Sequence, residues 1–92
     1  MPGALEGIKI VELAIWAAGP AGGGIMADWG AEVIKVEEPE GGDPFRGFLS
    51  LGVGAASASA INGSFDSDNR NKKSIAVDVR TPEGREIVYR LI

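Results

Sequence analysis

Apolar residues, many of them β-branched, gather in three short runs along the chain, at positions 8–13, 32–37 and 74–79. The first run is mostly apolar, which is typical of a strand that is covered on both faces. In the second run, Val33, Ile34 and Val36 form the apolar part. Segments rich in glycine and proline or with helical spacing separate the runs, and no internal repeat is evident. The pattern therefore predicts three strands.

Helical signals follow the first and the third of these runs. Gly19-Pro20 interrupts the first strand, and proline suits the first position of a helix, so a helix is predicted over about 21–29. Thr81 and Pro82 supply the N-cap hydroxyl and the first residue of a second helix. Apolar pairs one turn apart then mark its buried side, Ile87 with Leu91 and Val88 with Ile92.

Three consecutive glycines, Gly22 to Gly24, lie inside the first predicted helix. Each costs about 1 kcal/mol of helix stability relative to alanine. Propensity alone would not form this helix, so it has to be held by packing. The glycines are expected to allow close approach of the helix backbone to a strand, a ligand or a partner chain.

Between the second and third strands the chain has neither pattern. Residues 38–47 are predicted to form a turn and a loop, which an ion pair between Asp43 and Arg46 would fix. Residues 49–63 are almost all small, and 66–73 are charged and turn-forming. A loop is therefore predicted over 49–68.

The order strand–helix–strand–loop–strand–helix predicts the α/β class, with an open parallel sheet and right-handed crossovers. Three strands and two short helices bury little apolar surface for an independent fold. The chain is therefore expected to be an incomplete N-terminal part, residues 1–92, of a larger domain.

Charge and composition exclude several classes of function. The formal net charge of -4 argues against a nucleic-acid partner. The sequence has no cysteine and no histidine, which excludes thiol nucleophiles and the usual zinc sites, so no metal site is predicted. No signal peptide and no apolar run of about 20 residues are visible, so no membrane partner is expected. A cytoplasmic protein is the expectation.

The glycine-rich turn after the first strand raises the question of a dinucleotide site. Residues 19–24 read G-P-A-G-G-G, whereas the dinucleotide fingerprint is G-x-G-x-x-G. Pro20 also removes one N–H donor from the place where a pyrophosphate would need it. Glu37 and Glu38 lie near the position of a ribose-binding acid, but the glycine spacing disfavours NAD or FAD.

Four stretches, taken in order, cover most of the chain: 5–13 (LEGIKIVEL), 18–20 (AGP), 27–37 (ADWGAEVIKVE) with 42–47 (GDPFRG), and 69–79 (NRNKKSIAVDV) with 81–86 (TPEGRE). With them the sequence resembles the start of a class III CoA-transferase. This family includes formyl-CoA transferase, carnitine CoA-transferase and α-methylacyl-CoA racemase. The small-residue run over 51–63 carries no family signature.

The resemblance implies a Rossmann-like large domain, an intertwined homodimer, and acyl-CoA and carboxylic acid substrates. CoA is then a substrate, and no tightly bound cofactor is expected. The family's catalytic aspartate, which carries the acyl group and then CoA, would lie beyond residue 92, so no catalytic residue is assigned. By position, the resemblance places six residues at the CoA site: Ala17, Ala18, Val77, Asp78, Val79 and Arg80.

Two positions depart from the formyl-CoA transferase-like pattern. Family members often carry a polar side chain at the position of Ala17 and an arginine at the position of Glu38. An acid at position 38 would repel a phosphate, so CoA lies differently or another cation takes this role.

Basic and aromatic residues give further candidates. Arg70 and Lys72, with Lys73 beside them, could attract CoA phosphates, or Asp66 and Asp68 could neutralise them in a solvated loop. The two tryptophans, Trp16 and Trp29, could stack on adenine, although core or dimer packing is the favoured use.

The function predicted from the sequence is CoA transfer between carboxylic acids, with this chain contributing part of the CoA site and inactive by itself. A 2-methylacyl-CoA racemase is the alternative within the family. A non-catalytic CoA- or nucleotide-binding module, or a reading frame without activity, are alternatives of other classes.

Overall fold

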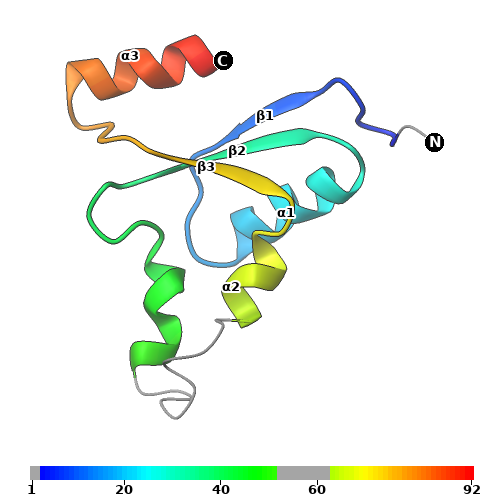
Figure 1. Cartoon of the computed structure of the whole chain (residues 1–92), viewed down its shortest axis with the longest axis horizontal. Coiled ribbons are helices and arrows are strands. Elements are labelled where there is room, and N and C mark those ends of the chain that lie inside the picture. The colour runs from blue at the N-terminus through cyan, green and yellow to red at the C-terminus, as the bar shows by residue number, and fades with distance from the viewer. Residues whose placement is uncertain (1–2, 52–62) are drawn as a thin grey trace.

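The computed structural model describes residues 3–51 and 63–92, with elements of both kinds alternating along the chain (Figure 1). In order they are β1 (Lys9–Glu12), α1 (Ala18–Asp28), β2 (Glu32–Glu37), the 3-10 helix η1 (Pro44–Leu51), α2 (Gly63–Asp68), β3 (Lys72–Ala76) and α3 (Pro82–Leu91).

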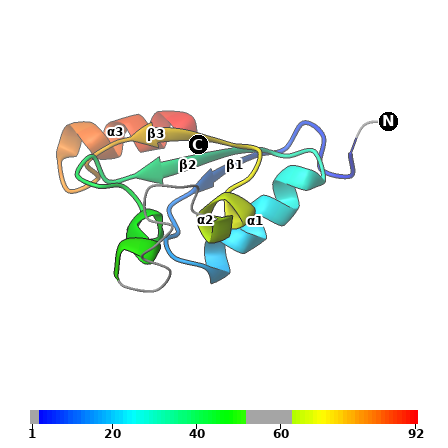
Figure 2. The ribbon, with the colours of Figure 1, turned by 60° about the horizontal axis from the view of Figure 1, so that its bottom comes forward.

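The three strands form one parallel sheet in the order β1-β2-β3. Ile10 of β1 aligns with Val33 of β2, and Val36 of β2 aligns with Ile75 of β3. Figure 2 shows α1 and α2 on one face of the sheet and α3 on the other. The prediction of an α/β fold with a parallel sheet is confirmed.

Each face of the sheet has its own small core. On the α1 face, Ala27, Ala31 and Val33 are buried together, and Met26 packs against them. On the α3 face, the buried cluster consists of Val36, Val77 and Val88, to which Val11, Ile75 and Leu91 add partly buried surface. Because β2 contributes to both clusters, it is the central strand in packing as well as in order.

The predicted start of α3 is confirmed in detail. The Thr81 Oγ1 accepts a hydrogen bond from the Gly84 amide at 3.0 Å, and Pro82 is the first helical residue. This cap fixes the turn that leads out of β3. It thereby sets where residues 77–80 lie.

Two predicted boundaries are wrong. β3 runs from Lys72 to Ala76, and not over 74–79, because the backbone of Lys72 and Lys73 already pairs with β2. α1 begins at Ala18, so Pro20 is the third helical residue and not the first. A proline is tolerated there because the first-turn N–H groups have no intrahelical partner in any case.

The loop predicted over 49–68 is partly wrong as well. η1 continues to Leu51, and α2 forms over the last six residues of the predicted loop. Phe65 of α2 is buried, and the Arg46 guanidinium lies over its ring at 4.2 Å from the centroid. This contact anchors a helix that the local sequence does not favour. Residues 52–62, the centre of the predicted loop, lie outside the described residues.

The glycine triplet is explained by close approach at two of its three positions. A Cβ on Gly23 would come within 2.1 Å of the Glu12 carboxylate, and one on Gly24 within 2.8 Å of the Asp68 carbonyl oxygen. A Cβ on Gly22 would meet nothing within 4 Å. The predicted packing role therefore applies to Gly23 and Gly24, and the neighbours are a buried charged side chain and the end of α2.

Candidate functional site

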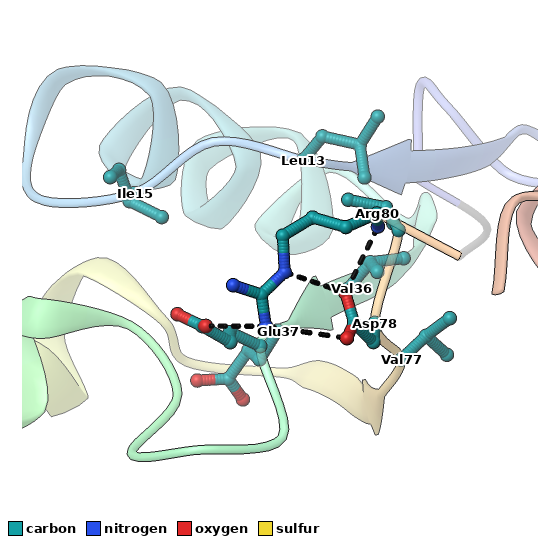
Figure 3. Close-up of a pocket in the computed structure, with 9 residues that line it drawn as sticks. Leu13, Ile15, Val36, Glu37, Val77, Asp78 and Arg80 are labelled. Carbon is teal, nitrogen blue, oxygen red and sulfur yellow. Dashed lines mark hydrogen bonds and ion pairs between the residues drawn. The ribbon is translucent and has the colours of Figure 1, made fainter.

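A cavity of about 440 Å³ lies at the edge of the sheet where the three strands end. Residues that follow β1, end β2 and follow β3 line it: Leu13, Ile15, Val36, Glu37, Glu38, Val77, Asp78, Val79 and Arg80 (Figure 3). Ligands of open α/β sheets bind beyond the carboxyl ends of the strands. Position and volume both fit a small-molecule site.

The cavity has apolar walls that water reaches. Leu13, Ile15 and Val79 are each between 41% and 59% exposed. A second cavity of about 270 Å³ shares Leu13 and Val79 with the first and extends to Tyr89 of α3. The two cavities therefore adjoin and offer apolar surface to an elongated ligand.

Arg80 is the only basic side chain among the described residues that line the main cavity. Its Nε donates to the Asp78 Oδ1 at 2.9 Å, and its Nη2 lies 3.4 Å from the Glu38 Oε1 (Figure 3). The Arg80 side chain is 71% exposed. Its hydrogen bonds hold the pKa of Asp78 below the usual value. We call Glu38, Asp78 and Arg80 the exposed ion cluster.

Glu37 lines the same cavity but has other partners. Its carboxylate receives two hydrogen bonds of 2.7 Å from the Arg46 guanidinium, one from the Asp43 amide at 3.0 Å and one from the Ser74 hydroxyl. Chiefly because of Arg46, the pKa of Glu37 falls to about 2. A carboxylate that is ionised and fully hydrogen-bonded is a structural anchor and a poor base or nucleophile.

Four buried charged side chains form a chain of ion pairs that reaches from the loop after β2 to the start of β3, and we call it the buried ion network: Asp43, Lys35, Glu12 and Lys72. Lys35 Nζ lies 2.8 Å from Asp43 Oδ2 and 2.9 Å from Glu12 Oε2, and Lys72 Nζ lies 2.7 Å from Glu12 Oε1. All four side chains are at most 5% exposed. Two positive and two negative charges balance, as buried charges require.

The pKa values of the network follow burial and pairing. Burial would raise the pKa of Asp43, but bonds from Lys35 and from the amides of Phe45 and Trp16 outweigh it and lower the pKa. Burial would lower the pKa of Lys35, but Asp43 and Glu12 outweigh it and raise the pKa. Burial lowers the pKa of Lys72, and Glu12 offsets this only in part.

The network also holds the loop between β1 and α1. Lys35 Nζ donates to the Ala14 carbonyl at 3.1 Å, and the Trp16 amide donates to Asp43 Oδ1 at 3.1 Å. Trp16 has φ +66°, a left-handed conformation that a bulky residue rarely adopts. Ile15, between these two anchors, lines the cavity.

The structure brings four of the predicted CoA-site residues together in the cavity: Val77, Asp78, Val79 and Arg80. Ala17 and Ala18 lie at the start of α1, next in sequence to the loop that carries Ile15, and both are exposed. They are not among the described residues that line the cavity.

Arg70 and Lys72 are not in the cavity, because they lie where β3 begins and the cavity lies where it ends. Arg70 Nη2 pairs with Asp28 Oδ2 at 2.6 Å, at the end of α1. Lys72 Nζ contacts Glu12 and also donates to the Pro20 carbonyl at 2.8 Å. The Asp28 carboxylate and, less strongly, the charge of Asp68 raise the pKa of Arg70. Local neutralisation by Asp68 therefore contributes, but the ion pairs of the cluster are formed with acids more distant in sequence.

The predicted pair of Asp43 with Arg46 is also wrong, although both residues do fix the loop after β2. Asp43 pairs with Lys35, and Arg46 pairs with Glu37. Asp43 and Lys35 are both buried, whereas the Glu37 carboxylate is buried and the Arg46 side chain is 45% exposed.

The tryptophans divide between packing and exposure. Trp16 packs against Phe45 with ring centroids 6.0 Å apart. Trp29, directly after α1, is 55% exposed, so it does not belong to a core of the described residues.

Five residues that line the cavity were not predicted as site residues from the sequence: Leu13, Ile15, Val36, Glu37 and Glu38. Their signal was present, because each lies at or just after the predicted end of a strand, where ligands of parallel sheets bind. Lys35 could not have been assigned, because its partner Asp43 is revealed only by the folded loop.

A parallel α/β sheet with a ligand-sized cavity beyond its strand ends defines a binding fold, and comparison with known proteins gives the family. The sequence profile of CoA-transferase family III matches residues 5–92, so the chain belongs to this family.

Curated relatives and solved structures agree with this assignment. The succinate–glutarate CoA-transferase of Agrobacterium fabrum is 45% identical over 89 residues, covering 96% of this chain and 22% of the relative. The human succinyl-CoA:glutarate CoA-transferase is 45% identical, covering 95% of this chain and 19% of the relative. A CAIB/BAIF family protein from Brucella suis superposes with a TM-score of 0.80 at 43% identity, over 99% of this chain and 24% of that one.

The chain thus spans about a fifth to a quarter of the length of the relatives that it matches. None of the helices within residues 3–51 and 63–92 has the length and apolar character needed to cross a bilayer.

Proposed function

We propose that this protein transfers CoA between carboxylic acids and that this chain forms part of its CoA site. The observation that carries the proposal is the coincidence of two independent results. The sequence belongs to CoA-transferase family III, and the main cavity is lined by the four residues at 77–80 that the family resemblance assigns to CoA.

The chemistry of the cavity suits such a ligand. CoA is elongated, with apolar stretches between polar and anionic groups, and the adjoining cavities offer Leu13, Val79 and Tyr89 as apolar surface. Arg80 supplies a cation that is exposed and bound only to exposed or half-exposed acids, so an anionic group of the ligand can replace one of them. Ala17 and Ala18 complete the proposed site from the start of α1.

Arg80 can replace the positive charge that related sequences carry at the position of Glu38. Where related sequences carry an arginine at position 38, this chain has an acid that contacts Arg80 at 3.4 Å. We propose that Arg80 supplies the missing positive charge from the neighbouring strand end. Arg70 and Lys72 are left out of the proposed site, because Asp28 and Glu12, which do not line the cavity, already hold them.

We assign no catalytic residue in this chain. Glu37 is committed to Arg46 and has a pKa of about 2. Glu38 and Asp78 are engaged by Arg80. The carboxylate that accepts the acyl group and then CoA is proposed to lie beyond residue 92.

The assembly and location that we propose follow the family resemblance. We propose a Rossmann-like sheet in the complete domain, a homodimer and a cytoplasmic protein. Exposed Ile25 on α1 and exposed Trp29 at its C-terminal end support further packing partners for this helix. The absence of cysteine from the sequence fits a reducing compartment.

The test is a transfer assay with the natural gene product. Succinyl-CoA is supplied as donor with a panel of acceptor acids that begins with glutarate, since two relatives carry these names. Mass spectrometry of the products is expected to show a new acyl-CoA with at least one acid. Epimerisation of a 2-methylacyl-CoA, with no transfer to any acid, would replace the proposal with the racemase alternative.

A further inference from the structure

We propose that Asp43 and Lys35 are positioning residues for the cavity. They hold the β1–α1 loop, residues 13–17, in an unfavourable conformation and thereby place Leu13 and Ile15 in the cavity wall. This inference rests on the proposed function only in the identity of the ligand used to test it.

The two side chains are built for this role by their burial and their contacts. Asp43 is 1% exposed, and its Oδ1 accepts from the Trp16 amide at 3.1 Å and from the Phe45 amide at 2.9 Å. Its Oδ2 lies 2.8 Å from Lys35 Nζ. Every polar atom of this carboxylate is therefore used between η1, β2 and the loop.

Lys35 holds the same loop at a second point. It is 2% exposed, and its ammonium donates to the Ala14 carbonyl at 3.1 Å while it also pairs with Glu12. The Ala14 carbonyl and the Trp16 amide lie on either side of Ile15. Two buried charges thus hold the backbone directly before and after a residue of the cavity wall.

The held conformation is one that the loop would not choose by itself. Trp16 has φ +66°, and left-handed backbone at a bulky residue costs free energy that surrounding contacts must offset. Trp16 remains 41% exposed, with Phe45 as a tilted neighbour of its ring, so side-chain packing offsets little of this cost. The hydrogen bond to Asp43 is the specific contact that offsets it.

The positions of Leu13 and Ile15 in the cavity wall depend on the backbone conformation, because packing of their side chains contributes little. Leu13 and Ile15 are 59% and 52% exposed. If the loop relaxes to φ below zero at Trp16, both side chains move with it. The shape of the cavity then changes while the sheet remains intact.

The experiment compares CoA affinity in variants of the natural gene product, measured well below each melting temperature. Asp43→Asn keeps the shape of the side chain but weakens both contacts, and it is expected to raise the Kd for CoA at least tenfold. Asp43→Glu keeps the charge that pairs with Lys35, but its extra methylene displaces the acceptor from the Trp16 amide. It serves as a second variant that keeps the buried charges balanced and is expected to raise the Kd at least fivefold.

A matched control separates positioning from stability. Val33 is 1% exposed and belongs to the core on the α1 face, with Ala27 and Ala31 as its buried neighbours. Val33→Ala lowers the melting temperature and is expected to leave the Kd for CoA within twofold. In a D43N background, Trp16→Asn is expected to recover at least threefold of the lost affinity, because asparagine adopts the left-handed conformation readily.

The outcomes are distinguishable. Unaltered protein that binds CoA, with Asp43 variants of the same affinity or a Val33→Ala loss as large as theirs, would overturn the positioning role alone. Unaltered protein that does not bind CoA would overturn the proposed function and this inference with it.

Discussion

The buried ion network and the exposed ion cluster use the same kinds of side chain for different work. In the network every charged side chain is at most 5% exposed and the ion-pair distances are 2.7–2.9 Å. In the cluster the side chains are 33–71% exposed and the distances are 2.9 and 3.4 Å. Both groups lie close to the ends of β1, β2 or β3, so location does not distinguish them.

The difference in burial determines which of these charged side chains a ligand can contact. Removing one partner from a buried pair leaves an uncompensated charge without water, so the network cannot exchange its partners. An exposed pair contributes little stability and can be replaced by an anion from the ligand. Burial, and not residue type, therefore separates structural charges from candidate binding charges in this chain.

The largest effect is expected from Lys35→Met, which leaves two buried acids with one ammonium between them. The free energy of unfolding should fall by about 3–5 kcal/mol, measured by urea denaturation. Lys73→Met is the matched control, because Lys73 is 72% exposed in a pair with Glu32 and should change stability by about 0.5 kcal/mol or less. Equal losses in the two variants would remove the distinction between the two groups of charges.

Glu37 belongs to neither group of charges, and its lowered pKa predicts a pH-dependent contribution to stability. Its pKa of about 2, against an ordinary value of 4.5, corresponds to about 3 kcal/mol of stability at neutral pH. Because the folded-state pKa is lowered, this contribution is complete above pH 4.5 and is lost as the pH falls towards 2. The stability difference between the unaltered protein and Glu37→Gln should shrink over that interval. A difference that stays constant with pH would contradict the lowered pKa.

Two glycines in one helix probe how tightly the network is enclosed. Gly23→Ala places a Cβ within 2.1 Å of the Glu12 carboxylate and should destabilise the protein by about 1–3 kcal/mol. Gly22→Ala has open space and should stabilise it by about 0.5–1 kcal/mol through helix propensity. Thermal unfolding of the two variants should thus shift in opposite directions. Melting temperatures that both rise would show that the buried ion network rearranges to accommodate a methyl group at position 23.

Arg80→Gln tests the cluster for binding without a large effect on stability. CoA affinity should fall about tenfold, as expected for a lost charge-assisted contact, and the melting temperature should hardly change. Arg90→Gln is the control, because Arg90 is 78% exposed in a pair with Glu86 on α3 and does not line the cavity. Calorimetric titration with CoA measures both variants, and equal affinities would remove Arg80 from the proposed site.

Glu38→Gln should have the smallest effect and the opposite sign. Releasing Arg80 from one acid should strengthen CoA binding about two- to fivefold, most clearly at low salt. Glu40→Gln removes the same charge from an exposed residue that does not line the cavity, and it should leave affinity unchanged. Weaker binding by Glu38→Gln would mean that Glu38 contacts the ligand directly.

The parts of this fold that follow from local chemistry could be predicted from the sequence. The Thr81 cap, the Pro82 start and the strand at 32–37 depend on neighbours in the chain, and the structure has them as expected. The boundaries of α1 and β3 were wrong, because Pro20 and Lys72 are placed by tertiary contacts.

The candidate site was predictable to the same extent. Residues 77–80 lie at the end of a predicted strand. Both the general rule for parallel sheets and the family resemblance therefore predicted them as ligand-site residues. The pairing of Lys35 with Asp43 could not be predicted, since the sequence around a lysine inside a strand does not indicate which acid will pair with it. The ion-pair partners of Arg70, Lys72 and Lys73 could not be predicted for the same reason, because they are distant in sequence.

Hydrogen–deuterium exchange of the natural gene product with and without CoA tests the central claim most directly, since both ends of β3 are observed together. We expect slower exchange in residues 13–18 and 77–80 when CoA is bound, with no change in residues 70–73. Slower exchange at 70–73 without protection at 77–80 would contradict it.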